Sequence, residues 1–463
     1  MKPDTVVSRR RINKSLNTTF QRIFFAGTSR LTEHFPVLGA RLLDATVRPL
    51  YGSPMLSMLF RQSNRRTLKK MGRARRFLVI ADSHIGDAVM LQSSLIALRD
   101  FFPDAEIDYA INKTVDPLIE GNPDATRIIP VFSNGLFPSP TDVAALRQII
   151  RKGQYDLCLN FCPFLRRKGL IAPGQPFIDF LSHAPTILRN ENDFVQINHF
   201  SYQAYQFVRE LFLMAARPVR NDFFPGVRTT YSDDAVENAR LFANEAGLLQ
   251  SSTVIMYNPD SNSKFNLMPF ENQAALLERL ARESSVDTTI LLGAGHTEAG
   301  IGERLLDCMS SPGRAKFRII PRAMPLEVFS ALIDFADVFI TGDTGPLHLA
   351  AARRYSRSGR HQFRNRTAVL SFFGATMPRM SGYDSFQAGY LPSNQDAPSW
   401  CYQAGSPCRN ITCLDKTFKT CSKVRCFEHV DEAGLATLIT SHLSELDRQT
   451  PARRRQDSSS GSV

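Results

Sequence analysis

The chain has 463 residues, of which 43% are hydrophobic and 22% charged, so its length and composition fit a globular protein with two domains. No segment offers the ~20 consecutive apolar residues of a membrane-spanning helix. No apolar segment with a cleavage site follows the first arginines, so we expect neither a transmembrane helix nor a secretory signal.

The net charge of +12 is concentrated at the N-terminal end. Residues 1–76 hold 17 Lys and Arg against three acidic residues, whereas the rest of the chain holds 39 basic and 41 acidic residues. This distribution disfavours a nucleic-acid-binding core and favours an N-terminal extension that meets an anionic surface. Because its basic residues are interleaved with Phe, Leu and Met, 1–76 is typical of helices lying on an anionic bilayer; a solvated extension packed on its own domain is the alternative.

The first regular unit follows this extension. Residues 77–81 form a continuous apolar run, which is typical of a parallel strand buried on both faces. A loop at 82–87, a helix and a strand at 107–111 come next, and the alternation continues as far as a strand at 157–161. This rhythm predicts a doubly wound α/β domain over residues 77–240.

The same rhythm restarts near residue 253. Strands are expected at 254–257, 289–292, 317–320, 338–340 and 367–372, separated by helices. We therefore expect a second α/β domain over residues 250–446. Three segments are interpreted differently: 226–252 as a linker region, 353–366 as a small insertion, and 447–463 as a disordered polar tail.

One strand-to-helix turn carries the clearest chemical signal. Asp343 and Thr344 follow the strand at 338–340 and stand where a helix N-cap is expected. A helix that begins there directs unpaired N–H groups and the positive end of its dipole outward, which favours anion binding. Gly345 permits close approach of a ligand, and His348 lies one turn beyond Thr344. The alternative is an ordinary turn of a parallel sheet with a structural histidine.

Two further loops follow strands and carry suitable side chains. The first-domain loop offers Asp87 beside Gly86, and the loop at 258–264 offers Lys264, a mobile cation suited to phosphate. Ligands bind at the carboxyl ends of strands in open α/β sheets. An acid on one domain and a phosphate cradle on the other predict a site for group transfer, although Asp87 would serve equally as a helix N-cap.

Four motifs, in the same order along the chain, resemble the heptosyltransferase-like glycosyltransferases of family 9. The motifs are residues 77–102 with the loop Ser83-His84-Ile85-Gly86-Asp87, then 254–264, 343–351 and 373–378. The resemblance spans roughly 77–446. The chain departs from the family pattern at Asp260, in place of a loop glycine, at 265–269 after the lysine, and at Ala375.

The resemblance implies a GT-B architecture, with two Rossmann-like domains facing across a cleft. It implies inverting transfer of a heptose from an ADP-activated nucleotide sugar to a lipid-linked saccharide such as the inner core of lipopolysaccharide. Asp87 would accept the proton of the acceptor hydroxyl. Lys264 and the amides of Thr344 and Gly345 would stabilise the departing diphosphate, so we expect no metal and no cofactor.

The other expected site residues follow from the same resemblance. His348 would donate to the phosphates, Asp343 would cap the helix and contact the sugar, Glu298 would bind the ribose hydroxyls, and Asn258 would belong to the donor site. Ser83, His84 and Gly86 would form the acceptor-side loop. The expected location is the cytoplasm, peripheral on the inner membrane through residues 1–76, without nucleic acid as a partner.

Two alternatives remain open. Five of the eight cysteines lie close together, at Cys401, Cys408, Cys413, Cys421 and Cys426. None has the C-x2-C spacing of zinc ribbons, so a metal site is the less favoured interpretation and a reducing compartment the simpler one. A protein heptosyltransferase of the autotransporter type with iron or zinc at this cluster is one alternative; a non-catalytic nucleotide-sugar-binding module is the other.

Overall fold

The computed structural model describes most of the chain after the basic extension. The described residues are 74–81, 84–133, 138–162, 176–180, 199–213, 226–261, 265–293, 300–374, 376, 378–404, 426–427 and 429–457. They all belong to one compact unit, made of residues 64–413 and 422–463. Residues 1–73 lie outside the described part, so the expectations for the extension stay predictions.

The first sheet has five strands, and each pair of neighbours runs parallel in the order β3-β2-β1-β4-β5. Its strands are β1 (Arg76–Ile80), β2 (Glu106–Asn112), β3 (Arg127–Phe132), β4 (Leu157–Asn160) and β5 (Phe177–Asp179). Residues Phe77 to Ile80 are fully buried, as the apolar run at 77–81 predicted. The order changes direction at β1, which is the feature that places ligand sites at the carboxyl end of a Rossmann-like sheet.

Helices connect these strands and cover the sheet. They are α4 (Ile85–Phe101), α5 (Asp116–Ile119), α6 (Pro140–Gly153) and α9 (Phe200–Leu213). Helix α4 packs against α9, and the Ser93 hydroxyl donates to the carbonyl of Ser201 at 2.6 Å. Because α9 packs against α4, polar side chains of α4 are buried as well as apolar ones.

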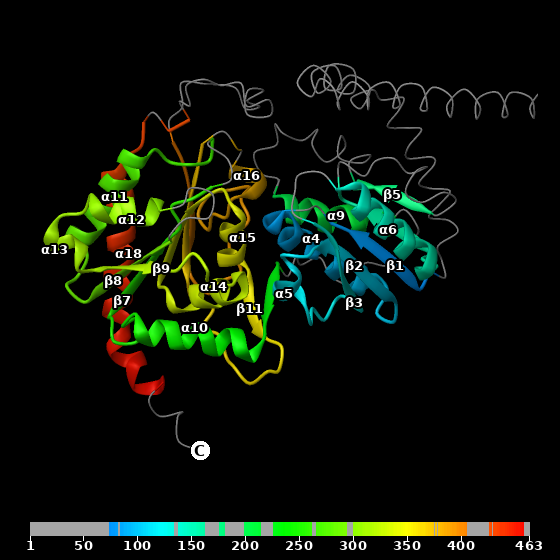
Figure 1. Cartoon of the computed structure of the whole chain (residues 1–463), viewed down its shortest axis with the longest axis horizontal. Coiled ribbons are helices and arrows are strands. Elements are labelled where there is room, and N and C mark those ends of the chain that lie inside the picture. Colours follow the sequence, from blue (N-terminus) through cyan, green and yellow to red (C-terminus); the bar gives the residue numbers. More distant parts are fainter. Residues whose placement is uncertain are drawn as a thin grey trace, which may run out of the picture. The chain divides into compact units, whose positions relative to one another are not determined.

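The second sheet has six parallel strands in the order β13-β12-β10-β7-β8-β9 (Figure 1). They are β7 (Thr253–Tyr257), β8 (Thr288–Gly293), β9 (Phe317–Ile320), β10 (Val338–Gly342), β12 (Ala368–Phe373) and β13 (Ser399–Gln403). Its helices are α11 (Phe270–Glu283), α12 (Ile301–Asp307), α13 (Ser311–Arg314), α14 (Leu326–Leu332) with the 3-10 turn η4 (Ile333–Phe335), α15 (Gly345–Ala351), α16 (Pro378–Ser381) and α18 (Glu432–Asp457). Two Rossmann-like sheets confirm the expected fold class.

The regions expected to be a linker and an insertion contain regular structure instead. Strand β6 (Arg228–Tyr231) pairs in parallel with β11 (Arg353–Ser356), and α10 (Asp233–Glu245) packs against α14. The expected boundaries at residues 240 and 250 stay predictions. The range 447–463 was expected to be disordered, but helix α18 continues to Asp457. Residues 458–463 lie outside the described part.

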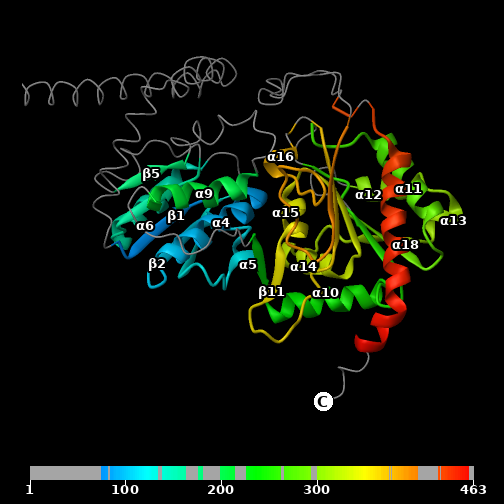
Figure 2. The ribbon, with the colours of Figure 1, turned by 180° about the vertical axis from the view of Figure 1, so that it is seen from behind.

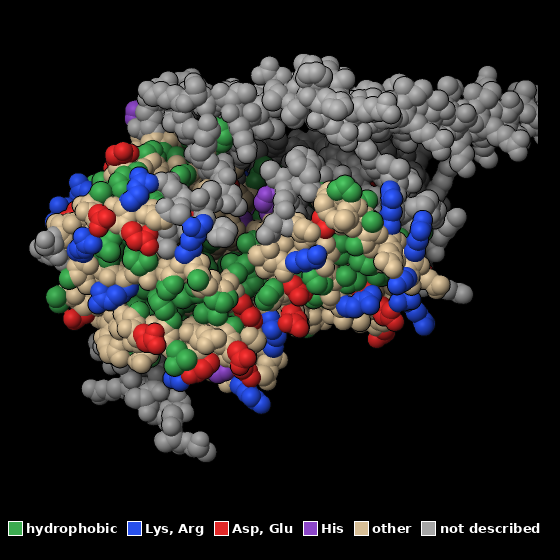
Figure 3. Space-filling view, viewed as in Figure 1, with side chains coloured by type: hydrophobic (Ala, Val, Ile, Leu, Met, Phe, Trp, Pro, Cys, Tyr) green, Lys and Arg blue, Asp and Glu red, His purple; other side chains and the backbone are tan. Residues whose placement is uncertain are grey.

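The surface of the described part agrees with its nearly balanced charge. Lys and Arg side chains alternate with Asp and Glu side chains over the face shown in Figure 3. Among the described residues, no helix combines the length and the hydropathy needed to cross a membrane.

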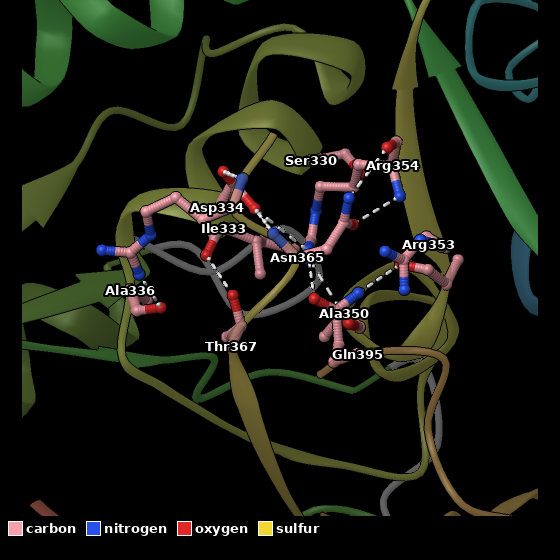
Figure 4. Close-up of polar contacts among 12 residues, drawn as sticks. Ser330, Ile333, Asp334, Ala336, Ala350, Arg353, Arg354, Asn365, Thr367 and Gln395 are labelled. Carbon is pink, nitrogen blue, oxygen red and sulfur yellow. Dashed lines mark hydrogen bonds and ion pairs between the residues drawn. The ribbon is translucent and has the colours of Figure 1, made fainter. Parts of the chain in front are cut away.

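A buried arginine links the end of α15 to the surrounding chain (Figure 4). Arg354 is 1% exposed, and its guanidinium donates to the carbonyl of Ala350 at 3.3 Å and to Oε1 of Gln395 at 3.1 Å. Asp334 supplies the opposite charge at 3.7 Å, and the backbone N–H of Asn365 donates to the same carboxylate. The cation therefore stabilises carbonyls at the C-terminal end of α15, where the helix dipole is negative.

Replacing Arg354 by Met should lower the free energy of unfolding by about 3 kcal/mol, because it leaves the Asp334 carboxylate buried without its cation. The matched control is Arg353→Met. Arg353 pairs with Asp396 at 3.0 Å, but both side chains are exposed, so its loss should cost less than ~1 kcal/mol. Urea unfolding of both variants at pH 7 measures the difference; equal costs would contradict the structural role assigned to Arg354.

Candidate active site

The N-terminal ends of α4 and α15 touch, which joins the first turn of one sheet to the motif turn of the other (Figures 1 and 2). A Cβ atom on Gly86 would lie 2.5 Å from Cδ2 and 3.0 Å from Nε2 of His348. A Cβ atom on Gly345 would lie 3.2 Å from Cβ of Ile85. Two loops that the sequence analysis assigned to one site therefore lie side by side.

Asp87 is the third residue of α4 and lies directly after this contact. The N-cap of α4 is His84 and not Asp87, which excludes the N-cap interpretation of the aspartate. The Asp87 side chain is 32% exposed, and its Oδ2 lies 3.6 Å from Nδ1 of His84. A carboxylate in the first turn is stabilised by the positive end of the helix dipole.

Tyr109 of strand β2 is hydrogen-bonded to the first turn of α4. Its side chain is fully buried in β2, and its hydroxyl donates to the carbonyl of Ala88 at 2.7 Å. Burial raises the pKa of Tyr109, and the nearby Asp87 charge raises it further. The phenol therefore stays protonated and holds the first turn of α4 in place.

The turn before α15 has Thr344 at the N-cap, whereas Asp343 lies one residue earlier. The Thr344 side chain makes no capping hydrogen bond; its Oγ1 lies 3.1 Å from Oγ1 of Thr341. The amide of Asn258 donates to the same Thr341 hydroxyl at 3.0 Å, which ties the end of β7 to the end of β10. Thr344 thus leaves the N-terminal amides of α15 without a side-chain cap.

Asn266 joins three loops and was not among the expected site residues. Its Nδ2 donates to the carbonyl of Asp343 at 3.1 Å and to the carboxylate of that residue at 3.3 Å. Its Oδ1 accepts from the Thr376 hydroxyl at 3.2 Å. A Cβ atom on Gly342 would lie 2.6 Å from the Asn266 carbonyl, so this close packing requires glycine. The only sequence signal was the departure from the family pattern at 265–269.

His348 is buried and neutral at pH 7. Its side chain is 3% exposed, its Nδ1 lies 3.1 Å from the Tyr383 hydroxyl, and burial lowers its pKa to about 3. A neutral imidazole supplies one hydrogen-bond donor and no positive charge. His348 therefore fits a role as a donor but not as a cation.

Other expected site residues lie outside the described part of the chain. They are Ser83, Lys264, Glu298, Cys408, Cys413 and Cys421. Of the remaining clustered cysteines, Cys401 has a free thiol and Cys426 is buried. Burial raises the pKa of Cys401 to about 12, and its thiol donates to the Tyr383 carbonyl at 3.4 Å. Among the described residues, no three His, Cys, Asp or Glu side chains form a group suited to a metal.

Comparisons with known proteins concern the fold and the family of the chain. A model of glycosyltransferase family 9 (heptosyltransferase) matches residues 182–355. The chain is 22% identical over 303 residues to lipopolysaccharide heptosyltransferase 3 of Escherichia coli (strain K12). The match covers 63% of this chain and 80% of that protein.

Two solved structures share the fold. The glycosyltransferase family 9 protein of Veillonella parvula DSM 2008 superposes with a TM-score of 0.59 and 18% identity, covering 81% of this chain and 99% of the other. The ADP-heptose lipopolysaccharide heptosyltransferase II of E. coli superposes with a TM-score of 0.55 and 15% identity, covering 80% and 99%.

The two Rossmann-like sheets and the likeness to these two solved structures define a fold of the GT-B type. The family model over residues 182–355 and the sequence relative both show a resemblance to the heptosyltransferase-like glycosyltransferases of family 9. The resemblance found from the sequence motifs is confirmed.

The stability of this region should depend on pH through two buried histidines. Burial, together with the neighbouring His348, lowers the pKa of His199 to about 3, and His348 has a similarly low pKa. Because an unfolded histidine titrates near 6.5, the unfolded chain binds more protons below that pH, and stability is lost as pH falls from 6.5 towards 3. We expect a loss of about 1 kcal/mol per histidine between pH 7 and pH 5.5.

Urea unfolding of the wild-type chain and of His199→Phe at both pH values measures this effect. The variant keeps an aromatic ring but has no titratable nitrogen, so it should lose about 1 kcal/mol less than the wild-type chain over the same interval. Other titrating groups contribute equally to both proteins. An identical pH dependence in the two proteins would show that His199 takes up its proton in the folded state.

Proposed function

We propose that the chain is an inverting glycosyltransferase that moves a heptose from an ADP-activated donor to a lipid-linked saccharide, such as the inner core of lipopolysaccharide. The observation that carries this proposal is the contact of Gly86 with His348 and of Gly345 with Ile85. This contact joins the turn of the candidate base to the turn of the candidate diphosphate site. The name of the E. coli relative supports heptose and lipopolysaccharide as the substrate class.

In the proposed reaction the acceptor hydroxyl attacks the anomeric carbon of the donor sugar. A new carbon–oxygen bond forms on one face while the bond to the diphosphate oxygen breaks on the other, which inverts the anomeric configuration. Asp87 accepts the hydroxyl proton, and its partly exposed carboxylate allows the acceptor to approach. His84 lies beside this carboxylate and belongs with Gly86 and Ser83 to the acceptor side.

The departing diphosphate needs stabilisation of its negative charge. The amides of Thr344 and Gly345 supply it at the positive end of α15, Lys264 supplies a full charge, and His348 donates one hydrogen bond. Asn258, Asp343 and Glu298 bind the rest of the donor. In this mechanism the protein groups replace a divalent metal, and no cofactor takes part.

The acceptor suggests where the enzyme works. We assign residues 1–76 to the anionic inner face of the membrane, since their excess of Lys and Arg would be attracted to acidic lipid headgroups. Among the described residues no observation favours a protein acceptor or a metal-bound cysteine cluster, and Cys401 is held as a protonated thiol.

Replacing Asp87 by Asn should reduce turnover by at least 10²-fold, because the carboxylate that takes the proton is lost. Binding of ADP should change little, since the diphosphate site is on α15. Calorimetry with ADP, UDP and GDP, followed by turnover of the matching nucleotide sugar, measures both. The control is Asp104→Asn, an exposed aspartate beyond the opposite end of α4. Full turnover by the Asp87 variant would rule out the assigned base.

Neutralising charges in the extension should weaken attachment to membranes. We expect a variant with Gln at Arg9, Arg10, Arg11, Lys69 and Lys70 to sediment less with vesicles containing anionic phospholipid, by roughly tenfold or more at ~1 kcal/mol per charge near the surface. The control carries Gln at five exposed basic residues of the folded part, Arg151, Lys152, Arg240, Arg282 and Arg322. If both variants lose binding equally, the extension is not the membrane contact.

A further inference from the structure

Tyr383 contacts two imidazole rings that come from different parts of the chain. Its fully buried hydroxyl is 3.1 Å from Nδ1 of His348. The ring centroid of His199 lies 4.6 Å from that of Tyr383. His199 precedes α9, which packs on α4 of the first sheet, whereas Tyr383 and His348 belong to the second. The tyrosine thus lies where the two parts meet.

The hydrogen bond between Tyr383 and His348 has one favourable direction. Within the described part of the chain, His348 is the hydrogen-bond partner of the Tyr383 hydroxyl. If Nδ1 of His348 carried the hydrogen, it would donate to the phenol oxygen and leave the phenol hydrogen buried without an acceptor, at a cost of about 1–3 kcal/mol. The phenol therefore donates, Nδ1 accepts, and the imidazole hydrogen is on Nε2.

Electrostatics keep both groups in the protonation states that this direction needs. Burial raises the pKa of Tyr383, and the charge of nearby Asp343 raises it further, so the phenol keeps its hydrogen. Burial lowers the pKa of His348 to about 3, so Nδ1 keeps a free lone pair at pH 7. A protonated His348 would have no lone pair to accept the tyrosine hydrogen.

The ring edge that carries Nε2 faces the junction of the two helices. A Cβ atom on Gly86 would lie 3.0 Å from Nε2, so a side chain at that position would occupy the space next to the Nε2 hydrogen. The same junction holds Asp87 on one side and the N-cap Thr344 on the other. The tautomer of His348 therefore decides whether this edge offers a hydrogen-bond donor or an acceptor.

We propose that Tyr383 is a positioning residue for the donor substrate: it donates to Nδ1 of His348 and so presents the Nε2 hydrogen to the diphosphate of the donor. This inference rests on the proposed function. The opposite tautomer would direct a lone pair towards the phosphate oxygens and repel them. His199, which precedes α9 on the side of the first sheet, packs against the tyrosine ring.

The first test reads the tautomer directly. Long-range nitrogen–proton correlation spectra of the full chain labelled with [15N]histidine distinguish the two neutral forms, and His348→Phe identifies the resonances of this residue. We expect hydrogen on Nε2 in the wild-type chain and a mixture of tautomers in Tyr383→Phe. Hydrogen on Nδ1 in the wild-type chain would overturn the proposal.

The matched control is Tyr231→Phe. Tyr231 is also fully buried and loses a hydroxyl with hydrogen-bond partners, Ser330 Oγ at 2.5 Å and Thr229 Oγ1 at 2.8 Å, but it does not contact His348. This variant should leave the His348 resonances unchanged. It separates the loss of one hydrogen bond from a general effect of removing a buried hydroxyl.

The second test asks whether Tyr383 acts through His348. Calorimetry should show ADP binding weakened ~3- to 10-fold in Tyr383→Phe, which is the range for one lost hydrogen bond. In the background of His348→Phe the same tyrosine change should weaken ADP binding less than ~2-fold, because the effect has no route to the ligand. An equal loss in both backgrounds would assign Tyr383 a separate structural effect and overturn the proposal.

The two tests separate this inference from the proposed function. If the wild-type chain binds UDP or GDP in place of ADP, the proposed donor is wrong, and the same cycle is run with the nucleotide that binds. If no nucleoside diphosphate binds, both the proposed function and the presentation of Nε2 to a diphosphate are wrong. The tautomer spectra then report only on the geometry of the Tyr383–His348 pair.

Discussion

The close approach of two helix N-termini is the constraint on which the site depends. Gly86 and Gly345 each lack a Cβ atom at the point where one would meet the other helix, so the carboxyl ends of the two sheets come together. The positive ends of α4 and α15 then converge, which is unfavourable by itself. A negative charge at the junction offsets this repulsion: Asp87 supplies one on the protein side, and a diphosphate would supply more. This is the electrostatic basis of the proposed diphosphate site.

At the C-terminal end of α15, where the helix dipole is negative, a positively charged side chain lies against the helix. Arg354 places a buried cation against the last carbonyls of the helix, and its own desolvation is offset by Asp334 and Gln395. The neighbouring strand pair β6–β11 holds Arg357 next to the first sheet, where it pairs with Glu120 at 3.0 Å and also donates to the Pro117 carbonyl. A short helix of seven residues is thus anchored at both ends, and its first turn has a defined place relative to Asp87.

The sequence predicted what depends on local pattern and missed what depends on distant pairing. Buried parallel strands are continuous apolar runs, so β1 and β10 were placed within two residues, and the topology then assigned the loops after them to one edge. The pairing of β6 with β11 was not predictable, because these short strands contain Arg and Thr and lie more than a hundred residues apart. Asn266, His199 and Tyr383 were missed because a single polar residue has no spacing signal and acquires its role only from tertiary contacts.

The neutrality of His348 matters for the proposed base as well as for the donor. A protonated imidazole at the α4–α15 junction would stabilise the ionised form of Asp87 and make it a weaker proton acceptor. Burial keeps the imidazole, which lies against Gly86 and Tyr383, uncharged at pH 7. In the proposed mechanism, Lys264 and the dipole of α15 supply the positive charge that the leaving diphosphate requires. The positive charge that stabilises the leaving group and the carboxylate that accepts the proton therefore come from different residues. Neither group then weakens the other.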